Sequence, residues 1–341
     1  MGQLLTDIRR TPLLWLLVFV PVVLYGEHVW RDQQTLLFML SVLAIIPLAA
    51  LLSRTTESVA EHTGDAVGGL LNATLGNLTE LVIAFTALQA GQYALVKASI
   101  AGAIVTNTLF MLGGAFLLGG LRHHIQEYNR VGARFQSSLL FVAVVALLVP
   151  SMVATADGAA GRPELQTLST TLAVLLIVGY VLGLLFSLKT HKEAFAGAAH
   201  EASEEPPMPL ATGVVMLLGI TVLVALVSEV FVGSVEAAGE SFGMSPTFVG
   251  FIVVSLVGAA AEMATAFSAA RKDRLDLSVG IALGSASQIA LFVAPVLVLL
   301  SYVIGPAPMG LDFWPGAVIM MLIAALTASI LTSGGRSAWF L

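Results

Sequence analysis

Ten apolar runs, each about as long as a bilayer is thick, dominate this sequence. They cover residues 12–28, 34–53, 65–90, 94–120, 135–155, 165–188, 209–235, 246–270, 275–304 and 313–332. A helix needs about 20 apolar residues to span a membrane, and these runs are too long and continuous for barrel strands. Only 11% of the residues are charged, against about 25% in soluble domains. The sequence therefore predicts an all-α polytopic membrane protein with about ten transmembrane helices.

The basic residues predict the orientation of these helices. With a cytoplasmic N-terminus, twelve of the fifteen lysines and arginines fall in cytoplasmic segments, and only Arg31, Lys97 and Arg162 fall on the other side. Cytoplasmic loops of membrane proteins carry such an excess. The first run lacks a cleavage-site pattern, so we expect a retained helix. The short chain without targeting extensions favours the inner membrane of a prokaryotic cell.

A polar segment, residues 189–208, divides the chain into two apolar halves. We expect a solvated acidic linker in the cytoplasm there, with a weak cation-attracting patch as the alternative. Residues 1–33 are then an extra N-terminal transmembrane helix, 34–188 a first transmembrane repeat and 209–341 a second. The first repeat has five runs and the second four, so either one helix of the second repeat is absent or the sequence ends before it.

Each half carries one glutamate in the middle of an apolar run. Residues 66–80 and 248–262 agree at four positions, which are Val67/Val249, Gly68/Gly250, Gly76/Gly258 and Glu80/Glu262. In the predicted orientation the run with Glu80 leads outward and the run with Glu262 leads inward. We therefore expect two inverted-topology repeats, an arrangement that places a substrate near the bilayer midplane.

The two glutamates predict a single cation site. A carboxylate inside a bilayer costs free energy and is usually functional. Other oxygen-bearing side chains lie one helical turn before Glu80 or in the next run of each half, and these are Asn77, Asn107, Ser285, Ser287 and Gln288. The alternative for the amides is a hydrogen bond between helices, and for the serines it is packing.

The residue types at this site favour exchange of a metal ion for protons. Carboxylate, amide and hydroxyl oxygens suit Ca²⁺, with Mg²⁺ and Mn²⁺ as alternatives, and Glu80 and Glu262 are its expected ligands. No lysine or arginine in the same runs neutralises them. When the metal leaves, the acids must therefore take up protons or another cation, and such competition is a simple basis for antiport. Apolar surroundings make protonation of a carboxylate easier.

Three further acids, Glu57, Glu61 and Asp65, lie at the cytoplasmic start of the third run. Acids are common at helix N-termini, which is the simpler interpretation. The alternative is a cytoplasmic entrance that attracts cations.

Other function classes fit the sequence less well. All six histidines lie in loops or at the ends of runs: His28, His62, His123, His124, His191 and His200. A buried histidine dyad of an intramembrane enzyme is therefore hard to build, and the absence of cysteine excludes disulfides and thiolate metal sites. A channel is a further alternative, but paired acids in inverted repeats fit alternating access better. We expect Ca²⁺, H⁺ and the bilayer as partners, with no cofactor and no nucleic acid.

At these residues the chain resembles the cation/proton exchangers (CAX) of the Ca²⁺/cation antiporter superfamily. Residues 76–83, Gly-Asn-Leu-Thr-Glu-Leu-Val-Ile, are similar to the first family signature, and Gly258-Ala-Ala-Ala-Glu262 lies where the second falls. Residues 276–295 also resemble the family. The resemblance implies an eleven-helix Ca²⁺/H⁺ antiporter in which Glu80 and Glu262 are the central carboxylates, surrounded by Asn77, Ser285 and Gln288.

The second signature departs from the family pattern at two positions. Ala259 and Met263 stand where the family usually has Asn and His, which removes one possible ligand and one titratable group from the implied site. The alternative within the same fold is an exchanger of Na⁺ for Ca²⁺ or for another divalent cation. Few polar ligands stand before Glu262, and this favours protons as the coupling ion.

Overall fold

The computed structural model describes residues 12–63, 65–157, 163–191 and 208–338. Within these ranges the chain is mostly helical, and every apolar run of the sequence forms helix. The predicted linker lies almost wholly outside the described residues. Six described helices are long and apolar enough to cross a membrane, and a bent pair at 246–258 and 260–271 makes up to seven. The total of ten crossings stays a prediction.

The described part of the first half contains eight α-helices and three short 3₁₀- or π-helical stretches. They are η1 (Pro12–Val18), α2 (Phe19–Val29), α3 (Gln34–Glu61), α4 (Asp65–Leu75), α5 (Leu78–Gln89), α6 (Tyr93–Val105), η2 (Thr106–Met111), α7 (Leu112–His123), α8 (Arg130–Asp157), α9 (Pro163–Leu185) and η3 (Phe186–Thr190).

The described part of the second half has seven α-helices and two π-helical stretches. They are α11 (Leu210–Phe242), α12 (Pro246–Phe248), η4 (Val249–Val254), α13 (Ser255–Gly258), α14 (Ala260–Arg271), α15 (Leu275–Gln288), η5 (Ile289–Val293), α16 (Ala294–Leu300) and α17 (Pro315–Leu331).

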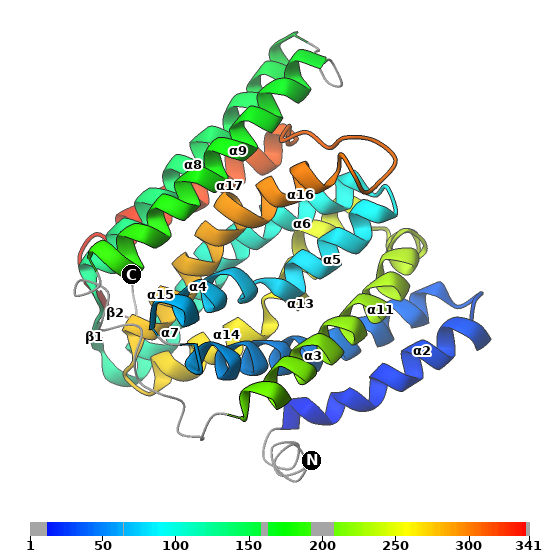
Figure 1. The fold of residues 1–341 in the computed structure, drawn as a ribbon, viewed down its shortest axis with the longest axis horizontal. Coiled ribbons are helices and arrows are strands. Elements are labelled where there is room, and N and C mark those ends of the chain that lie inside the picture. The colour runs from blue at the N-terminus through cyan, green and yellow to red at the C-terminus, as the bar shows by residue number, and fades with distance from the viewer. Residues whose placement is uncertain (1–11, 64, 158–162, 192–207, 339–341) are drawn as a thin grey trace.

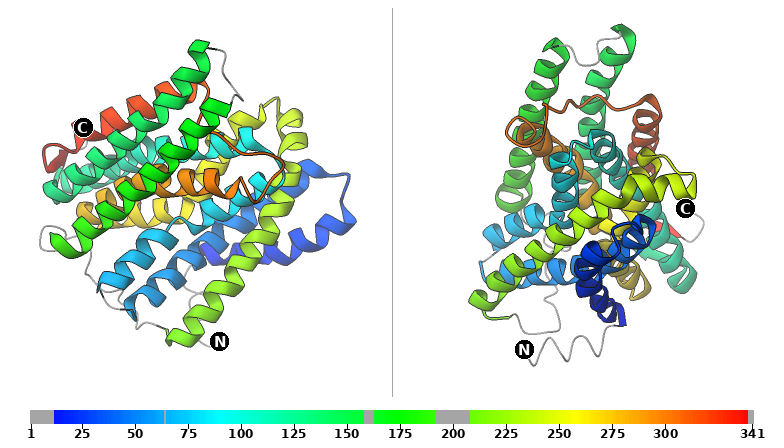
Figure 2. Two further views of the ribbon diagram at one scale, coloured as in Figure 1. Left: turned by 45° about the horizontal axis from the view of Figure 1, so that its top comes forward. Right: turned by 90° about the vertical axis from the view of Figure 1, so that its right-hand side faces the viewer.

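The helices from the two halves are interleaved rather than packed as two separate bundles (Figure 1). Helices α2, α3 and α11 form one side, and the rings of Phe38 and Phe231 stack between α3 and α11 with centroids 5.2 Å apart. Helices α8 and α9 form the opposite side (Figure 2). Between them lie α5, α6, α15 and α16, so the middle of the molecule is built from both halves.

A small sheet that the sequence did not predict joins the halves at one end. Strands β1 (Ile125–Glu127) and β2 (Arg336–Ala338) pair antiparallel. The buried Gln126 side chain donates to the carbonyl oxygen of Ala270 and to Asp273, in the turn before α15. By the predicted orientation this end is cytoplasmic, and the turns between α5 and α6 and between α16 and α17 lie at the outer end.

Both signature runs are broken helices, which corrects the expectation of one continuous helix in each. Helix α4 ends at Leu75 and α5 begins at Leu78, with Asn77 (φ −96°, ψ 27°) as the residue before it. The second break lies at Ala259, where the chain bends by 55°. Asn77 therefore precedes α5 instead of lying within the same helix as Glu80.

Candidate cation site

The two glutamates occupy matching places at the breaks. Glu80 lies in the first turn of α5 and Glu262 in the first turn of α14. The N-terminus of a helix carries a partial positive charge that stabilises a nearby carboxylate. Each break therefore creates a short helix whose positive end lies beside an acid, which offsets part of the cost of placing that acid inside a membrane.

The carboxylate of Glu80 lies against the other broken helix. A Cβ atom added to Gly258 would be 3.0 Å from Glu80 Cγ and 3.2 Å from Glu80 Oε1. Only glycine leaves room for this approach, four residues before Glu262. Glu262 in turn interacts electrostatically with Glu80 and lies beside Ser285. The structure thus brings both predicted carboxylates to one place.

A chain of hydrogen bonds connects four of the predicted polar residues across the two halves. Asn107 Nδ2 donates to Ser285 Oγ at 2.9 Å, and Ser285 Oγ donates to Asn77 Oδ1 at 2.6 Å. Asn77 Nδ2 donates to Gln288 Oε1 at 2.6 Å. The four hydrogen-bonded residues come from η2, from α15 and from the break between α4 and α5. Their bonds hold the amide groups in fixed orientations. The polar side-chain atoms of Asn77 and Ser285 thus form hydrogen bonds with each other and with these two neighbours.

Three buried oxygens at the site lack a hydrogen-bond partner among the described residues. They are Glu80 Oε1, Glu262 Oε2 and Asn107 Oδ1. Buried polar atoms in proteins are normally paired, and an ionised carboxylate or an amide oxygen can only accept. A cation or a proton on each acid would satisfy them. Oxygen atoms of this kind are the ligands that Ca²⁺ prefers.

The remaining predicted residues lie away from this group. Ser287 Oγ donates to the backbone oxygen of Gln136 on α8, at 3.0 Å. Glu57 is exposed near the end of α3 but interacts electrostatically with Glu262. Glu61 ends α3 and Asp65 begins α4. Of the three expected entrance residues, Glu57 is thus close enough to interact with Glu262.

Sequence reasoning missed one polar contact next to the site. Thr106 Oγ1 and Ser255 Oγ are 3.1 Å apart and both residues are buried. The contact joins η2 of the first half to α13 of the second. Two hydroxyl residues in apolar runs were the signal, but serine and threonine are common in such runs and only the fold shows that these two meet.

The outer and inner ends of the site differ in how closely their helices pack, although the sequences of the two ends match. At the outer end a Cβ on Gly102 would collide with the backbone of Phe251 in η4, and a Cβ on Gly250 would be 2.8 Å from Ala98 Cβ. At the other end a Cβ on Gly284, which matches Gly102, would meet nothing closer than Gln136 Nε2 at 3.5 Å. Helices α6 and η4 are therefore in close contact, whereas α15 is not in such contact with α4.

Exposure of the matched valines agrees with this difference. Val249 in η4 is fully buried, while Val67 in α4 is 51% exposed. A Cβ on Gly69 would be 2.7 Å from a methyl carbon of Leu188, so α4 packs against η3. Among the described residues, the helices are thus in closer contact on the outer side of the site than on the inner side.

Comparisons with known proteins agree with this architecture. The family described as sodium/calcium exchanger protein matches residues 33–189 and 212–341. The chain is 41% identical to a Ca²⁺/H⁺ antiporter of Aphanothece halophytica, over 97% of this chain and 92% of that protein. It is 38% identical to the Ca²⁺/H⁺ antiporter ChaA of Bacillus subtilis, over 94% and 91%. The solved structure of native YfkE matches with a TM-score of 0.81 at 34% identity, covering 95% of this chain and 92% of that one.

Proposed function

Because this chain belongs to the sodium/calcium exchanger protein family, and within it to the Ca²⁺/H⁺ antiporters, we propose that it exchanges Ca²⁺ for H⁺ across a membrane. Glu80 and Glu262 bind either the metal or protons. The observation that carries this proposal is the pair of buried, unpartnered carboxylate oxygens at the two helix breaks.

Charge balance couples the two ions. Two ionised carboxylates are neutralised by one Ca²⁺ or by two protons, so either loaded site crosses the membrane without a net charge of its own. An empty, ionised site is costly in a medium of low dielectric constant. The carrier therefore changes sides mainly when loaded, which is what exchange requires.

The four hydrogen-bonded residues of the site have different roles in this proposal, and they are Asn77, Asn107, Ser285 and Gln288. The free Oδ1 of Asn107 is a third ligand of the cation. Asn77 and Ser285 orient it and Gln288 through their hydrogen bonds. Ala259, which matches Asn77, cannot do the same in the second half, so the two halves contribute unequally.

In this proposal the cation site, which lies between two inverted repeats, opens alternately to the two sides of the membrane. The close approach at Gly102 and its absence at Gly284 support an inward-open state, with Glu57 at its cytoplasmic entrance. Movement of α6 away from η4, together with closure of α15 onto α4, opens the outer side. The matched glycines allow either approach.

Flux measurements in proteoliposomes test the proposal. Ca²⁺ uptake driven by a pH gradient, without Na⁺, is compared for the parent chain, Glu80→Gln and Glu262→Gln. We expect proton-driven flux in the parent and a loss of at least about 100-fold in each variant, because neutral amides neither carry the charge nor exchange a proton. Glu240→Gln changes an exposed glutamate at the end of α11 and is the matched control.

Other outcomes would contradict parts of the proposal. Flux that requires Na⁺ instead of a pH gradient would assign the chain to exchange of Na⁺ for Ca²⁺. Undiminished flux in both glutamine variants would remove Glu80 and Glu262 from the site.

A further inference from the structure

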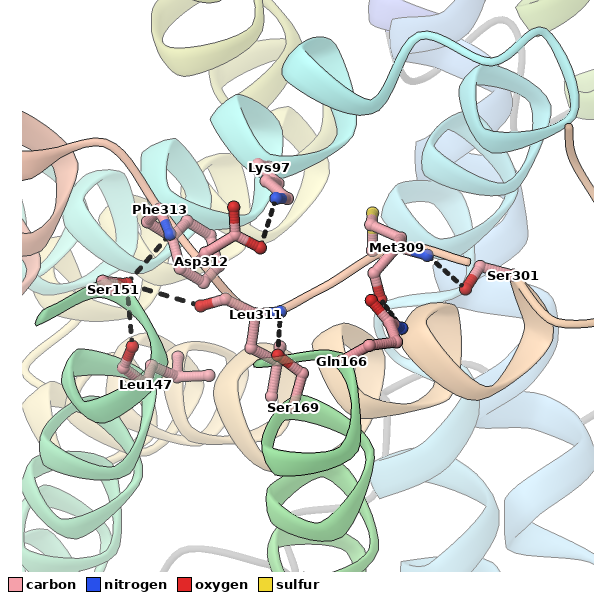
Figure 3. Close-up of polar contacts among 10 residues, drawn as sticks. All are labelled: Lys97, Leu147, Ser151, Gln166, Ser169, Ser301, Met309, Leu311, Asp312 and Phe313. Atoms are coloured by element: carbon pink, nitrogen blue, oxygen red, sulfur yellow. Dashed lines mark hydrogen bonds and ion pairs between the residues drawn. The ribbon is translucent and has the colours of Figure 1, made fainter. Parts of the chain in front are cut away.

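The loop between α16 and α17, residues 301–314, is bound closely to the outer end of the molecule (Figure 3). Three serine hydroxyls accept hydrogen bonds from its backbone. Met309 N donates to Ser301 Oγ at 2.8 Å, Leu311 N to Ser169 Oγ at 3.1 Å and Phe313 N to Ser151 Oγ at 2.9 Å. Ser151 belongs to α8 and Ser169 to α9, so these bonds hold the loop to the side of the molecule away from α11.

One ion pair connects the same loop to α6. Lys97 Nζ lies 2.9 Å from Asp312 Oδ1, and their side chains are 17% and 27% exposed (Figure 3). Tyr93, one turn earlier on α6, both accepts a hydrogen bond from Ala307 N and donates one to Ala307 O. Lys97 is the one lysine or arginine inside any of the ten apolar runs, and the serine contacts do not reach α6.

Two residues after Asp312, the loop contacts the outer closure of the site. The rings of Trp314 and Phe251 meet edge to face, with centroids 6.1 Å apart. The backbone of Phe251 lies directly against Gly102. A cavity of 460 Å³ lies beside this contact, lined by Tyr93, Ala94, Lys97, Thr247 and Trp314. Residues of α6, α12 and the loop thus surround the crevice that must widen when α6 and η4 separate.

We propose that the Lys97–Asp312 ion pair is a latch that holds the outer side of the carrier closed. The pair draws the segment from Asp312 to Trp314 toward α6, and Trp314 then holds Phe251 against Gly102. This rests on the alternating access proposed above. Lys97 and Asp312 are positioning residues: they touch no cation at the site, and they set how often the outer side opens.

The absence of cysteine from the chain allows a direct test of outer accessibility. Ala103 is 3% exposed and matches Ser285 by the repeat, so Ala103→Cys places a small thiol on the outer side of the site. Its reaction with a membrane-impermeant thiol reagent, added only outside right-side-out vesicles, reports opening of the outer side. The reporter does not require Ca²⁺ transport.

The latch predicts specific changes in this labelling rate. Lys97→Gln and Asp312→Asn each raise it about fivefold, the factor for an ion pair worth about 1 kcal/mol. The double variant with exchanged charges, Lys97→Asp with Asp312→Lys, returns it toward the parent value. Arg336→Gln is the control, because it breaks the exposed Arg336–Glu127 pair at the other end of the molecule and is expected to leave the rate unchanged.

Two results would overturn the latch: labelling at the parent rate in both single variants, or an equal rise in the Arg336→Gln control. The charge-exchanged variant excludes loss of folding as a cause, because it changes both positions and is expected to label at nearly the parent rate. The proposed function fails differently. If the latch variants change labelling but Ca²⁺ flux ignores Glu80→Gln and Glu262→Gln, the latch stands and the cation site is wrong.

Discussion

The outer and inner ends of the site are built from matching sequence but differ in contact. Outside, Gly102 of α6 lies against the backbone of Phe251. Inside, a Cβ atom added to the matching Gly284 of α15 would approach nothing more closely than the Gln136 side chain, at 3.5 Å. The same residue type therefore permits a close approach at both ends, while only one approach is made. This is the arrangement expected of a carrier whose two sides close in turn.

The comparison also shows where the difference in energy between the two ends arises. The outer approach is reinforced by the Thr106–Ser255 contact and by Trp314 against Phe251. At the inner end α4 packs against η3 instead, since a Cβ on Gly69 would be 2.7 Å from a methyl carbon of Leu188. For transport the two states must lie within a few kcal/mol of each other, so single contacts of ordinary strength can shift the balance.

The largest expected effect follows from filling the outer approach. In Gly102→Ala the added methyl group collides with the Phe251 backbone, which has no rotamer to move away. Overpacking of this kind costs about 1–3 kcal/mol, and we expect outside labelling of Ala103→Cys to rise more than about tenfold. A rate equal to that of the parent would show that α6 and η4 are not the outer closure.

The matched substitution at the inner end is expected to act in the opposite direction. Gly284→Ala fits the present state, since its methyl group would lie 3.5 Å from Gln136 Nε2. The methyl group obstructs only the state in which α15 closes onto α4, so outside labelling falls and Ca²⁺ flux slows. Equal effects of the two alanine variants would disprove the asymmetry of the ends.

A smaller effect is expected from removing the amide that only the first half possesses. Asn77→Ala removes the donor to the Gln288 amide oxygen and the acceptor of the Ser285 hydroxyl, which keeps only its bond from Asn107, and a buried unpaired group costs about 1–3 kcal/mol. We expect the melting temperature to fall and the Ca²⁺ dissociation constant to rise about tenfold, measured by scanning calorimetry and isothermal titration calorimetry.

The control for Asn77 is Asn72→Ala. Asn72 is exposed on α4, outside the chain of hydrogen bonds, and its substitution is expected to leave Ca²⁺ binding unchanged. If Asn77→Ala changes the melting temperature but not Ca²⁺ affinity, Asn77 supports the fold and does not orient the ligands.

The helices could be predicted because apolar runs of bilayer length have few alternative folds. The helix breaks were not predicted, because a glycine within an apolar run, such as Gly76 or Gly258, indicates either close packing or a local break, and close packing was the favoured interpretation. The 3₁₀- and π-helical stretches depend on packing against neighbours, which no local pattern reveals. Strand β1 was missed because its three residues pair with β2, more than 200 positions later.

Members of the candidate site could be predicted where an acid within an apolar run made a residue exceptional. Glu80 and Glu262 are acids in apolar runs, and the structure brings them together as expected. The contacts of the amides could not be predicted from their sequence positions. Three amide side chains are linked by hydrogen bonds through Ser285, and these are Asn77, Asn107 and Gln288. Ser287, two residues after Ser285, bonds to α8 instead. Residues two apart on a helix point to different faces, but the sequence does not show which of the two serines faces Asn77 and Asn107.

The weakest contact in the comparison is the hydroxyl pair beside the site, and it gives the smallest predicted effect. Thr106→Val keeps the shape of the side chain and removes its bond to Ser255, at a cost of about 1 kcal/mol. Outside labelling should rise about two- to fivefold. Thr108→Val is the matched control, because Thr108 is equally buried but bonds only within its own helix, to Ile104 and Val105. If the hydroxyls matter only for helix stability, both variants change the labelling rate equally. If the Thr106 hydroxyl helps to close the outer side, the labelling rate rises for Thr106→Val alone.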